Sequence, residues 1–419
     1  MAAEKKISSV PSVQDVDADL QAKKLQLHWL LQITKAINYN FSTKQLFDVY
    51  EHVLRSQLKV EKLALLIHDG QWRCSLLYGT DKSFADIDLT RIIGELNKLH
   101  NLELEQELWI SAFDSILPVY HKDHLIAYAL VGGLSNSVIP KRNELVPFIH
   151  TITNLIVVAI ENNTIANEKI RQAGIRKELE LAAQMQSMLF PTNLPRVKEY
   201  ELHATYQPHQ EVGGDYYDFI QLNKNEFIFC MADVSGKGIP AALLMSNFQA
   251  NLHALLPHTN SLSELVSLLN TKVFQSAKGE KFITFFIGRY HALTRELHYV
   301  NAGHNPPFLI HEKVVYMLND GSTGLGMFED LPFVNTGKVF IPPNAMLHCY
   351  TDGVIDVEND EGNEFGMDRL RDFLTSRNQL HNMEELHSQL IAALSTFRQS
   401  KNYTDDITLL SCWFKNLSL

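Results

Sequence analysis

Aspartates that end apolar runs recur through the second half of this 419-residue sequence. The clearest example lies in residues 227–240, which read FIFCMADVSGKGIP. An apolar run ends at Asp233, a glycine-containing loop follows at 235–238, and a helical pattern begins at Ile239. This order predicts a buried strand that directs one carboxylate to a fixed point, next to glycines that let other groups come close. Taken alone, Asp233 could equally well cap a turn or a helix.

Three further stretches place aspartate after an apolar run or in a tight turn. They are EVGGDYYD with Asp215, YTDGV with Asp352, and YTDDIT with Asp405 and Asp406. No Cys or His near them has the spacing of a zinc site, and carboxylates alone select hard cations such as Mg²⁺, Mn²⁺ or Ca²⁺. Two such ions can share a water, lower its pKa and stabilise a phosphate that is attacked in line. No GxSxG or Ser-His-Asp pattern supplies a protein nucleophile instead.

Each of these aspartates has a bland alternative as a solvated turn residue. Four such placements in one half of the chain favour a shared carboxylate site.

The composition limits the class of protein. The formal net charge of −11, from 48 acidic and 37 basic residues, argues against a nucleic-acid binder, which needs a basic face. The four cysteines are far apart and form no CxxC pair, so we expect reduced thiols in a cytoplasmic protein. The first 20 residues contain no apolar segment typical of a signal peptide, and no run of about 18 apolar residues predicts a transmembrane helix.

Residues from about 196 onward consist mainly of short apolar runs broken by Gly, Asp and Asn. Many strands with few helices between them predict two antiparallel sheets packed face to face, with helices outside, in an α+β fold. The predicted strands are 201–206, 216–222, 226–233, 282–291, 296–301, 307–310, 346–351 and 408–414. The predicted helices are 239–256, 263–276, 368–375 and 383–398.

The first part of the chain follows a different order. A polar tail is expected over residues 1–20, followed by a helix, and Ser42 to Gln45 read as a capping box before a second helix. Two hairpins are predicted at 63–78 and 115–132, and a long apolar helix at 144–165. This layout, an α+β arrangement around an antiparallel sheet, resembles a GAF sensor domain over residues 21–165. No Cys or His arrangement there indicates a haem, tetrapyrrole or metal ligand.

Residues 166–195 form the predicted connection between the two parts. The segment is charged and helical, and Pro191 and Pro195 end it. Apolar residues at heptad-like steps, with a polar residue at one core-like position, favour a short coiled coil that would join two copies of the chain as a homodimer. The alternative is a single amphipathic helix that packs on its own catalytic domain. The residues of this seam are Ile175, Leu179, Ala182, Gln186 and Leu189.

Seven stretches in order resemble the metal-dependent PPM-type protein serine/threonine phosphatases, and among them the SpoIIE/RsbU-like branch of bacterial signalling. They cover residues 178–414 and read ELELAAQMQSMLFPTNLP, EVGGDYYDFI, MADVSGKGIPAALLM, NAGHNPP, TGLGM, YTDGVIDVEN and YTDDITLL. The resemblance implies an αββα sandwich over residues 196–419. It also implies hydrolysis of phosphoserine or phosphothreonine on a protein by a metal-activated water.

The resemblance further implies the ligands of two Mn²⁺ or Mg²⁺ ions. Asp233 would bridge the ions, and the backbone carbonyl of Val234 would complete one site. Asp215 would bind one ion, while Asp352 and Asp405 would bind the other. Asp406 is the alternative to Asp405, because adjacent acids cannot be separated by sequence alone.

Two other residues near these motifs have open roles. His304 could donate a proton to the leaving oxygen, although a structural hydrogen bond is the stronger expectation for a histidine in an Asn-Gly turn. Lys237 could contact phosphate or face solvent, and the sequence favours neither role over the other.

By resemblance, the substrate is a phosphorylated regulator of the anti-sigma-factor antagonist kind, and the GAF-like domain and the connecting helix regulate the phosphatase. Two alternatives stay open at this point. One is a phosphatase-like module that only binds a phosphorylated protein. The other is a dimetal hydrolase of small phosphoesters, which the lack of an aromatic or basic base-binding motif disfavours.

Overall fold

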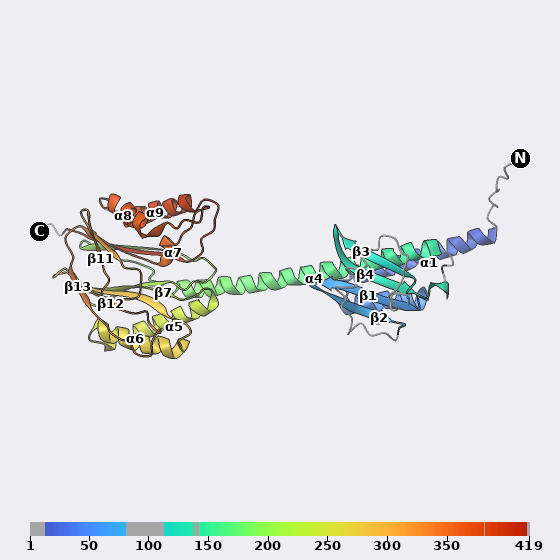
Figure 1. The fold of residues 1–419 in the computed structure, drawn as a ribbon, viewed down its shortest axis with the longest axis horizontal. Helices are drawn as coiled ribbons and strands as arrows, with labels where there is room; N and C mark the ends of the chain where they lie inside the picture. The colour runs from blue at the N-terminus through green and yellow to red at the C-terminus, as the bar shows by residue number, and fades with distance from the viewer. Residues whose placement is uncertain (1–12, 81–112, 137–138, 140–141, 381, 417–419) are drawn as a thin grey trace. The chain divides into compact units, whose positions relative to one another are not determined.

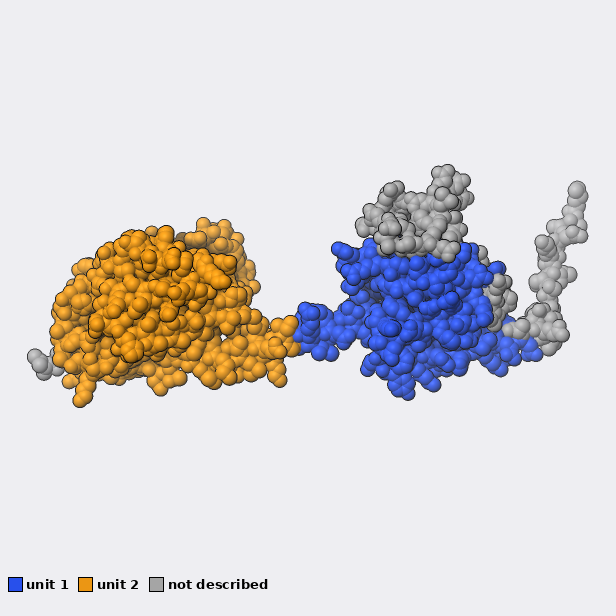
Figure 2. Space-filling model, turned by 90° about the horizontal axis from the view of Figure 1, so that it is seen from below, with its two compact units in different colours: residues 1–173 blue, residues 174–419 orange. Residues whose placement is uncertain are grey.

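The structure is a computed structural model that describes residues 13–80, 113–136, 139, 142–380 and 382–416. The chain divides into two compact units, unit 1 from Met1 to Ala173 and unit 2 from Gly174 to Leu419 (Figure 2). Each unit has its own apolar core. Residues 1–12 of the predicted tail lie outside the described residues, and the rest of that tail is helical because α1 begins at Val13.

Unit 1 contains three described α-helices and a four-stranded antiparallel sheet in the order β2-β1-β4-β3. Both predicted hairpins are present, and β1 pairs with β4 to join them into one sheet. The elements are α1 Val13–Asn38, α2 Thr43–Glu51, a π-helical turn His52–Gln57, β1 Lys62–Asp69, β2 Gln71–Tyr78, β3 Ser115–His121, β4 His124–Gly132, a short 3₁₀ turn Leu134–Asn136 and α4 Arg142–Ser187.

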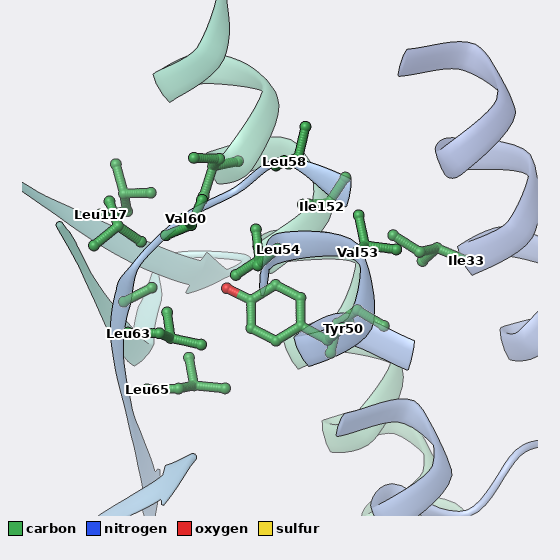
Figure 3. Packing of buried hydrophobic residues seen from close by; sticks show 14 of the residues in the cluster. Ile33, Tyr50, Val53, Leu54, Leu58, Val60, Leu63, Leu65, Leu117 and Ile152 are labelled. Carbon is green, nitrogen blue, oxygen red and sulfur yellow. The ribbon is translucent and has the colours of Figure 1, made fainter. Parts of the chain in front are cut away.

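Local sequence signals explain how unit 1 is built. The Ser42 hydroxyl accepts the Gln45 N–H, and the Gln45 side chain accepts the Ser42 N–H, so the predicted capping box starts α2. Gly70 turns the first hairpin with φ of 69°. The core packs α1, α2 and α4 against the sheet (Figure 3), and the buried hydroxyls of Tyr50 and Thr153 lie 2.6 Å apart.

Helix α4 is one continuous helix of 46 residues, where the sequence predicted an apolar helix followed by a charged one. Its segment Glu144–Ser187 is long and apolar enough to span a membrane by length and composition alone. However, 44% of the most apolar stretch of this segment is buried inside the protein. Ile149, Ile152 and Ile156 belong to the unit 1 core and are fully buried. Among the described residues there is therefore no clear membrane span.

Unit 2 contains every strand and helix that the sequence predicted, each within two residues of the expected ends. The sequence missed three short strands and the four-residue helix α7. The strands are β5 Tyr200–Gln207, β6 Tyr216–Gln221, β7 Glu226–Val234, β8 Ile283–His291, β9 Glu296–Ala302, β10 Phe308–His311, β11 Val314–Met317, β12 Gly321–Ser322, β13 Gly337–Phe340, β14 Ala345–Tyr350 and β15 Ile407–Phe414. The helices are α5 Ile239–Leu255, α6 Leu262–Ala277, α7 Asp352–Ile355, α8 Gly366–Ser376 and α9 Met383–Arg398, with a 3₁₀ turn Leu256–His258.

These strands form two sheets. We call the first the β7 sheet, in the order β12-β9-β8-β7-β6 with β13 paired to β9, and the second the β15 sheet, in the order β11-β10-β14-β15-β5. One apolar cluster fills the space between the sheets, a second lies under α5 and α6, and a third lies under α8 and α9. Unit 2 is therefore a four-layer sandwich with two helices on each outer face (Figure 1).

Candidate functional site

The end of β7 directs Asp233 into the space between the two sheets. Side chains alternate along a strand, and Phe229 and Met231 belong to the cluster between the sheets, whereas Cys230 and Ala232 face α5 and α6. Asp233 follows the same alternation as Phe229 and Met231. It therefore lies where the apolar filling of the sandwich ends.

The β15 sheet brings further carboxylates to the same end. Asp352 directly follows β14 and Asp405 lies just before β15. These two strands are antiparallel neighbours, and the Thr351 N–H donates to the Thr408 carbonyl at 3.1 Å, which holds their ends together. The charges of both aspartates act on Asp233. The structure thus brings together residues that are far apart in the sequence.

The carboxylates destabilise one another's charged forms. Burial, followed by the negative charges of Asp352 and Asp405, raises the pKa of Asp233 to about 7. Burial and the Asp405 charge likewise raise the pKa of Asp352. Nearby Asp356, which the sequence analysis did not select, has a pKa raised by burial and then by Asp352. A divalent cation among these groups would remove this repulsion.

Asp215 lies at the start of β6 and is only 2% exposed. Its Oδ2 accepts hydrogen bonds from the Thr351 hydroxyl at 2.8 Å and from the Thr408 hydroxyl. Burial, followed by the charge of Asp233, raises its pKa well above the ordinary value, and the two carboxyl groups lie within hydrogen-bonding distance. The two threonines fix the direction of the Asp215 carboxylate toward Asp233.

Asp405 and Asp406 have different surroundings. The Asp406 carboxylate is buried and accepts the backbone N–H groups of His209 at 2.7 Å and Gly214 at 2.8 Å. The Asp405 side chain is 34% exposed, and its Oδ2 lies 2.7 Å from Lys237 Nζ. Asp406 therefore holds the loop before Asp215 in place. Asp405 and Asp406 both line a small pocket that Asp233 and Lys237 also line.

Close backbone contacts explain two of the glycines. A Cβ on Gly353 would lie 1.9 Å from the carbonyl oxygen of Asp406, so no larger residue fits after Asp352. A Cβ on Gly214 would lie 3.2 Å from the Val234 carbonyl oxygen. Val234, the expected backbone ligand, therefore lies directly against the Gly213-Gly214 turn.

The donor set fits a hard divalent cation in its chemistry. Among the described residues, no three or more carboxylate, His or Cys side chains are grouped closely enough to hold a metal ion by themselves. Mg²⁺ does not require this, because it usually binds through one or two carboxylates and keeps several waters. Two observations support such a site. The potential ligands are all oxygen atoms, and the pKa values of Asp215, Asp233 and Asp352 are raised.

His304 and Lys237 are both tied to other protein groups. His304 is buried, its Nδ1 lies 2.9 Å from the Thr284 hydroxyl, and burial lowers its pKa to about 3. Its backbone N–H donates to the Asn301 side chain at 2.8 Å. Lys237 donates to the Thr404 carbonyl besides pairing with Asp405. These contacts favour structural roles for both residues.

Sequence reasoning missed three side chains that position the site. Thr351 and Thr408 stand beside aspartates in the quoted motifs, but their joint contact with Asp215 depends on strand pairing that the sequence does not reveal. Gln186 is 7% exposed and makes two hydrogen bonds with Gly213, one at 2.8 Å and one at 3.1 Å. Its polar nature at a core-like heptad position was the available signal.

Comparisons with known proteins concern the fold and the family of unit 2. Residues 223–415 match the family model of Stage II sporulation protein E (SpoIIE). The SiaA-PP2C domain of Pseudomonas aeruginosa has the same fold over 58% of this chain and 99% of that domain, with a TM-score of 0.51 and 20% identity. Unit 2 thus matches the SpoIIE family model over residues 223–415 and has the fold of a PP2C domain.

Two relatives of the SpoIIE-type domain come from Bacillus subtilis (strain 168). Phosphoserine phosphatase RsbU is 31% identical over 193 residues, which are 46% of this chain and 57% of RsbU. Phosphoserine phosphatase RsbP is 27% identical over 187 residues, which are 43% of this chain and 46% of RsbP. This chain therefore spans less than two thirds of the length of the curated relatives it matches.

Proposed function

We propose that the chain is a signalling protein phosphatase that hydrolyses phosphoserine or phosphothreonine on a regulatory protein. The observation that carries the proposal is the meeting of Asp215, Asp233, Asp352 and Asp405 at one end of the sandwich. The names of the relatives RsbU and RsbP, both phosphoserine phosphatases, support the same reaction.

The proposed ligands of two Mn²⁺ or Mg²⁺ ions are Asp233 between the ions, Asp215 and the Val234 carbonyl on one side, and Asp352 and Asp405 on the other. Bound ions would supply an activated water and positive charge for the phosphate. The protein's part is to fix the carboxylates in direction and to exclude competing contacts, which Thr351 and Thr408 do for Asp215.

We assign Asp405 rather than Asp406 as the ligand. Both oxygens of Asp406 already accept backbone N–H groups. The Asp405 side chain is 34% exposed. We assign a structural role to His304, because burial lowers its pKa to about 3 and the neutral imidazole lacks the acidic imidazolium proton that a general acid donates.

Hydrolysis of p-nitrophenyl phosphate and of a phosphothreonine peptide, with Mn²⁺, Mg²⁺ or EDTA, tests this function. Wild-type turnover should require the metal and should vanish in Asp233→Asn. No turnover with any metal, together with no metal binding, would leave a phosphoprotein-binding module as the better explanation. Turnover of the small ester but of no phosphopeptide or phosphoprotein would indicate a small-phosphoester hydrolase.

We further propose that unit 1 is a GAF-like sensor and that α4 carries its signal to the phosphatase. Support comes from Gln186, near the end of α4, which bonds Gly213 two residues before Asp215. Gln186→Ala should change basal activity several-fold, whereas Gln184→Ala, an exposed neighbour, should not. Removal of residues 1–173 should also change basal activity, and equal activity with and without them would contradict the proposal.

Helix α4 also supports a homodimer through its exposed part. Ile175 is 48% exposed, so its side chain is accessible for a contact with a second copy of the chain. The last predicted seam residues serve unit 2 instead, because Gln186 bonds Gly213 and Leu189 packs in the core under α5. The molecular mass from sedimentation, for wild type and Ile175→Asp, tests the dimer.

We also propose a cytoplasmic location, which the four free cysteines support.

A further inference from the structure

The loop between β12 and β13, residues 323–336, presents large apolar side chains to solvent. Met327 is 43% exposed, and Phe328 and Phe333 are each 51% exposed. A single exposed apolar residue needs no explanation. Three within seven positions of one loop form a patch of the kind that marks an interaction surface.

This loop has a fixed backbone that does not depend on those side chains. The buried Asn270 of α6 donates to the carbonyls of Phe328 at 3.1 Å and Glu329 at 2.9 Å, and it accepts the Gly326 N–H at 2.8 Å. Leu331 and Val334 point inward and pack on the core under α5 and α6. The exposed residues are thus free to serve a partner, because other residues anchor the loop.

The loop begins beside the carboxylate site. Leu325 and Ile283 exchange two backbone hydrogen bonds of 2.9 Å and 2.8 Å, and Ile283 pairs with Val234 at the end of β7. Neighbouring strands lie about 4.8 Å apart, so Leu325 is about 10 Å from Val234. Met327 folds back over Gly324, since a Cβ on that glycine would meet its side chain at 3.0 Å. The loop therefore starts two strand spacings from Val234, the residue after Asp233.

We propose that the 323–336 loop is the docking surface for the phosphoprotein substrate and sets its specificity. The proposal rests on the proposed function, because the loop starts about two strand spacings from Val234, beside the Asp233 to which a substrate would present its phosphoserine. Met327, Phe328 and Phe333 would contact apolar side chains near the phosphorylated residue. The exposed Glu329 and Asp330 lie between these contacts and favour a basic residue in the same segment.

Two synthetic phosphoserine peptides test this specificity. They are identical except that one carries Leu, Phe and Lys beside the phosphoserine and the other carries Ser, Gly and Glu. The full chain with Mn²⁺ should hydrolyse the first peptide with a kcat/KM at least about tenfold higher, equivalent to about 1.4 kcal/mol. Equal kcat/KM values for the two peptides would overturn the proposal.

Variants separate docking from chemistry. Met327→Ser/Phe328→Ser/Phe333→Ser should remove the preference and leave hydrolysis of p-nitrophenyl phosphate within twofold, while Phe328→Ser alone should reduce the preference partly. The matched control Leu293→Ser/Tyr316→Ser changes residues that are 72% and 53% exposed, outside this loop, and should keep the preference. A retained preference in the triple variant, or a parallel loss on p-nitrophenyl phosphate, would contradict docking.

Binding measurements keep the test independent of turnover. If wild type hydrolyses no phosphoester, the proposed function fails, and fluorescence anisotropy of the two labelled peptides then decides on the loop alone. Tighter binding of the apolar peptide that the triple variant loses would support the docking surface, and equal binding would refute it. A change of sedimentation mass in the triple variant would instead assign the patch to a second copy of the chain.

Discussion

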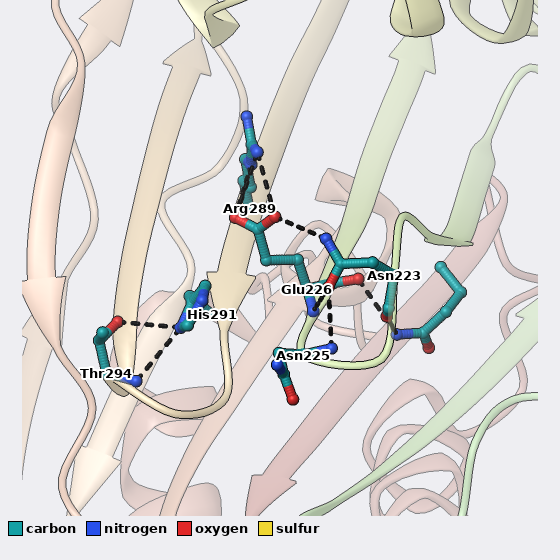
Figure 4. Close-up of polar contacts among 7 residues, drawn as sticks. Asn223, Asn225, Glu226, Arg289, His291 and Thr294 are labelled. Atoms are coloured by element: carbon teal, nitrogen blue, oxygen red, sulfur yellow. Dashed lines mark hydrogen bonds and ion pairs between the residues drawn. The ribbon is translucent and has the colours of Figure 1, made fainter.

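The carboxylates at the two ends of the β7 sheet have different surroundings, and their pKa values are shifted in opposite directions. At the end where β7 begins, Glu226 pairs with Arg289 at 3.1 Å and accepts a hydrogen bond from Asn223 (Figure 4). Glu296, at the start of β9, pairs with Lys338 at 2.7 Å. The side-chain hydrogen bonds to these cations lower the pKa of both glutamates. At the other end, burial and neighbouring carboxylates raise the pKa of Asp215 and Asp233.

The difference teaches how to separate structural from functional charge in this protein. The balanced pairs at the Glu226 end are partly exposed, and such pairs contribute at most about 1 kcal/mol to stability. At the clustered end Asp215 is buried, Asp233 and Asp352 are half-buried, and their charges oppose one another, so they cost folding free energy. A cluster with that cost is expected where a cation or substrate is bound.

The largest effect that would sharpen this comparison is expected for Asp352→Asn. Loss of one proposed ligand removes several kcal/mol of transition-state stabilisation, so hydrolysis of p-nitrophenyl phosphate should fall at least about 10²-fold. The matched variant Glu296→Gln, at the balanced end, should change the rate less than about twofold. Steady-state kinetics at saturating Mn²⁺ measure both. Equal losses of rate in Asp352→Asn and Glu296→Gln would contradict the difference between the two ends.

A smaller effect is expected for Thr408→Val, which removes one hydroxyl that fixes Asp215. Groups that orient ligands typically contribute about 10- to 100-fold in metal affinity or activity. The variant should therefore need more Mn²⁺ for half-maximal activity, a change that a purely structural defect would not produce. Thr294→Val, in the turn at the balanced end, is the control. An unchanged Mn²⁺ requirement in Thr408→Val would argue against its positioning role.

The smallest effect concerns histidines that are buried without a charged partner. His348 and His387 each lie 2.7 Å from the Ser411 hydroxyl, and burial lowers the pKa of His348 to about 3 and that of His387 well below its usual range. The folded state therefore prefers neutral imidazoles. Their stabilisation is fully present above the unfolded pKa of about 6.5 and is lost as the pH falls.

Each of these histidines should cost about 1.4 kcal/mol in the free energy of unfolding between pH 7.5 and 5.5. Urea unfolding at the two pH values, for wild type and His348→Gln, isolates the contribution, because the acidic groups titrate alike in both proteins. The pH dependence should be weaker in the variant. An identical pH dependence would show that His348 does not titrate in this way.

Much of unit 2 could be predicted because its strands are short apolar runs that end at glycine or aspartate. β7 is an example: its apolar run and the turn after Asp233 define both its ends. The strands β11, β12 and β13 were missed because they are short or polar on their exposed face and depend on pairing with distant strands. Likewise α7 is a single turn that starts at Asp352 and has no periodicity to detect.

The residue types of the candidate site could be proposed from the sequence. The contacts that hold these residues in place could not. The aspartates could be selected because each follows an apolar run or lies in a tight turn. The roles of Asp405 and Asp406 could not be separated, because only the fold brings the Gly214 N–H to Asp406. Gln186 gave a signal as a polar residue in an apolar seam, but its partner Gly213 is 27 residues away and was not recognisable from spacing.

The most direct test of the central claim is Mn²⁺ binding by isothermal titration calorimetry to the full chain and two variants. Asp233→Asn changes the clustered end of the β7 sheet and Glu226→Gln changes its balanced end. The account predicts that wild type and Glu226→Gln bind Mn²⁺ alike and that Asp233→Asn loses binding. Equal binding by all three proteins, or by none, would contradict a metal site at Asp233.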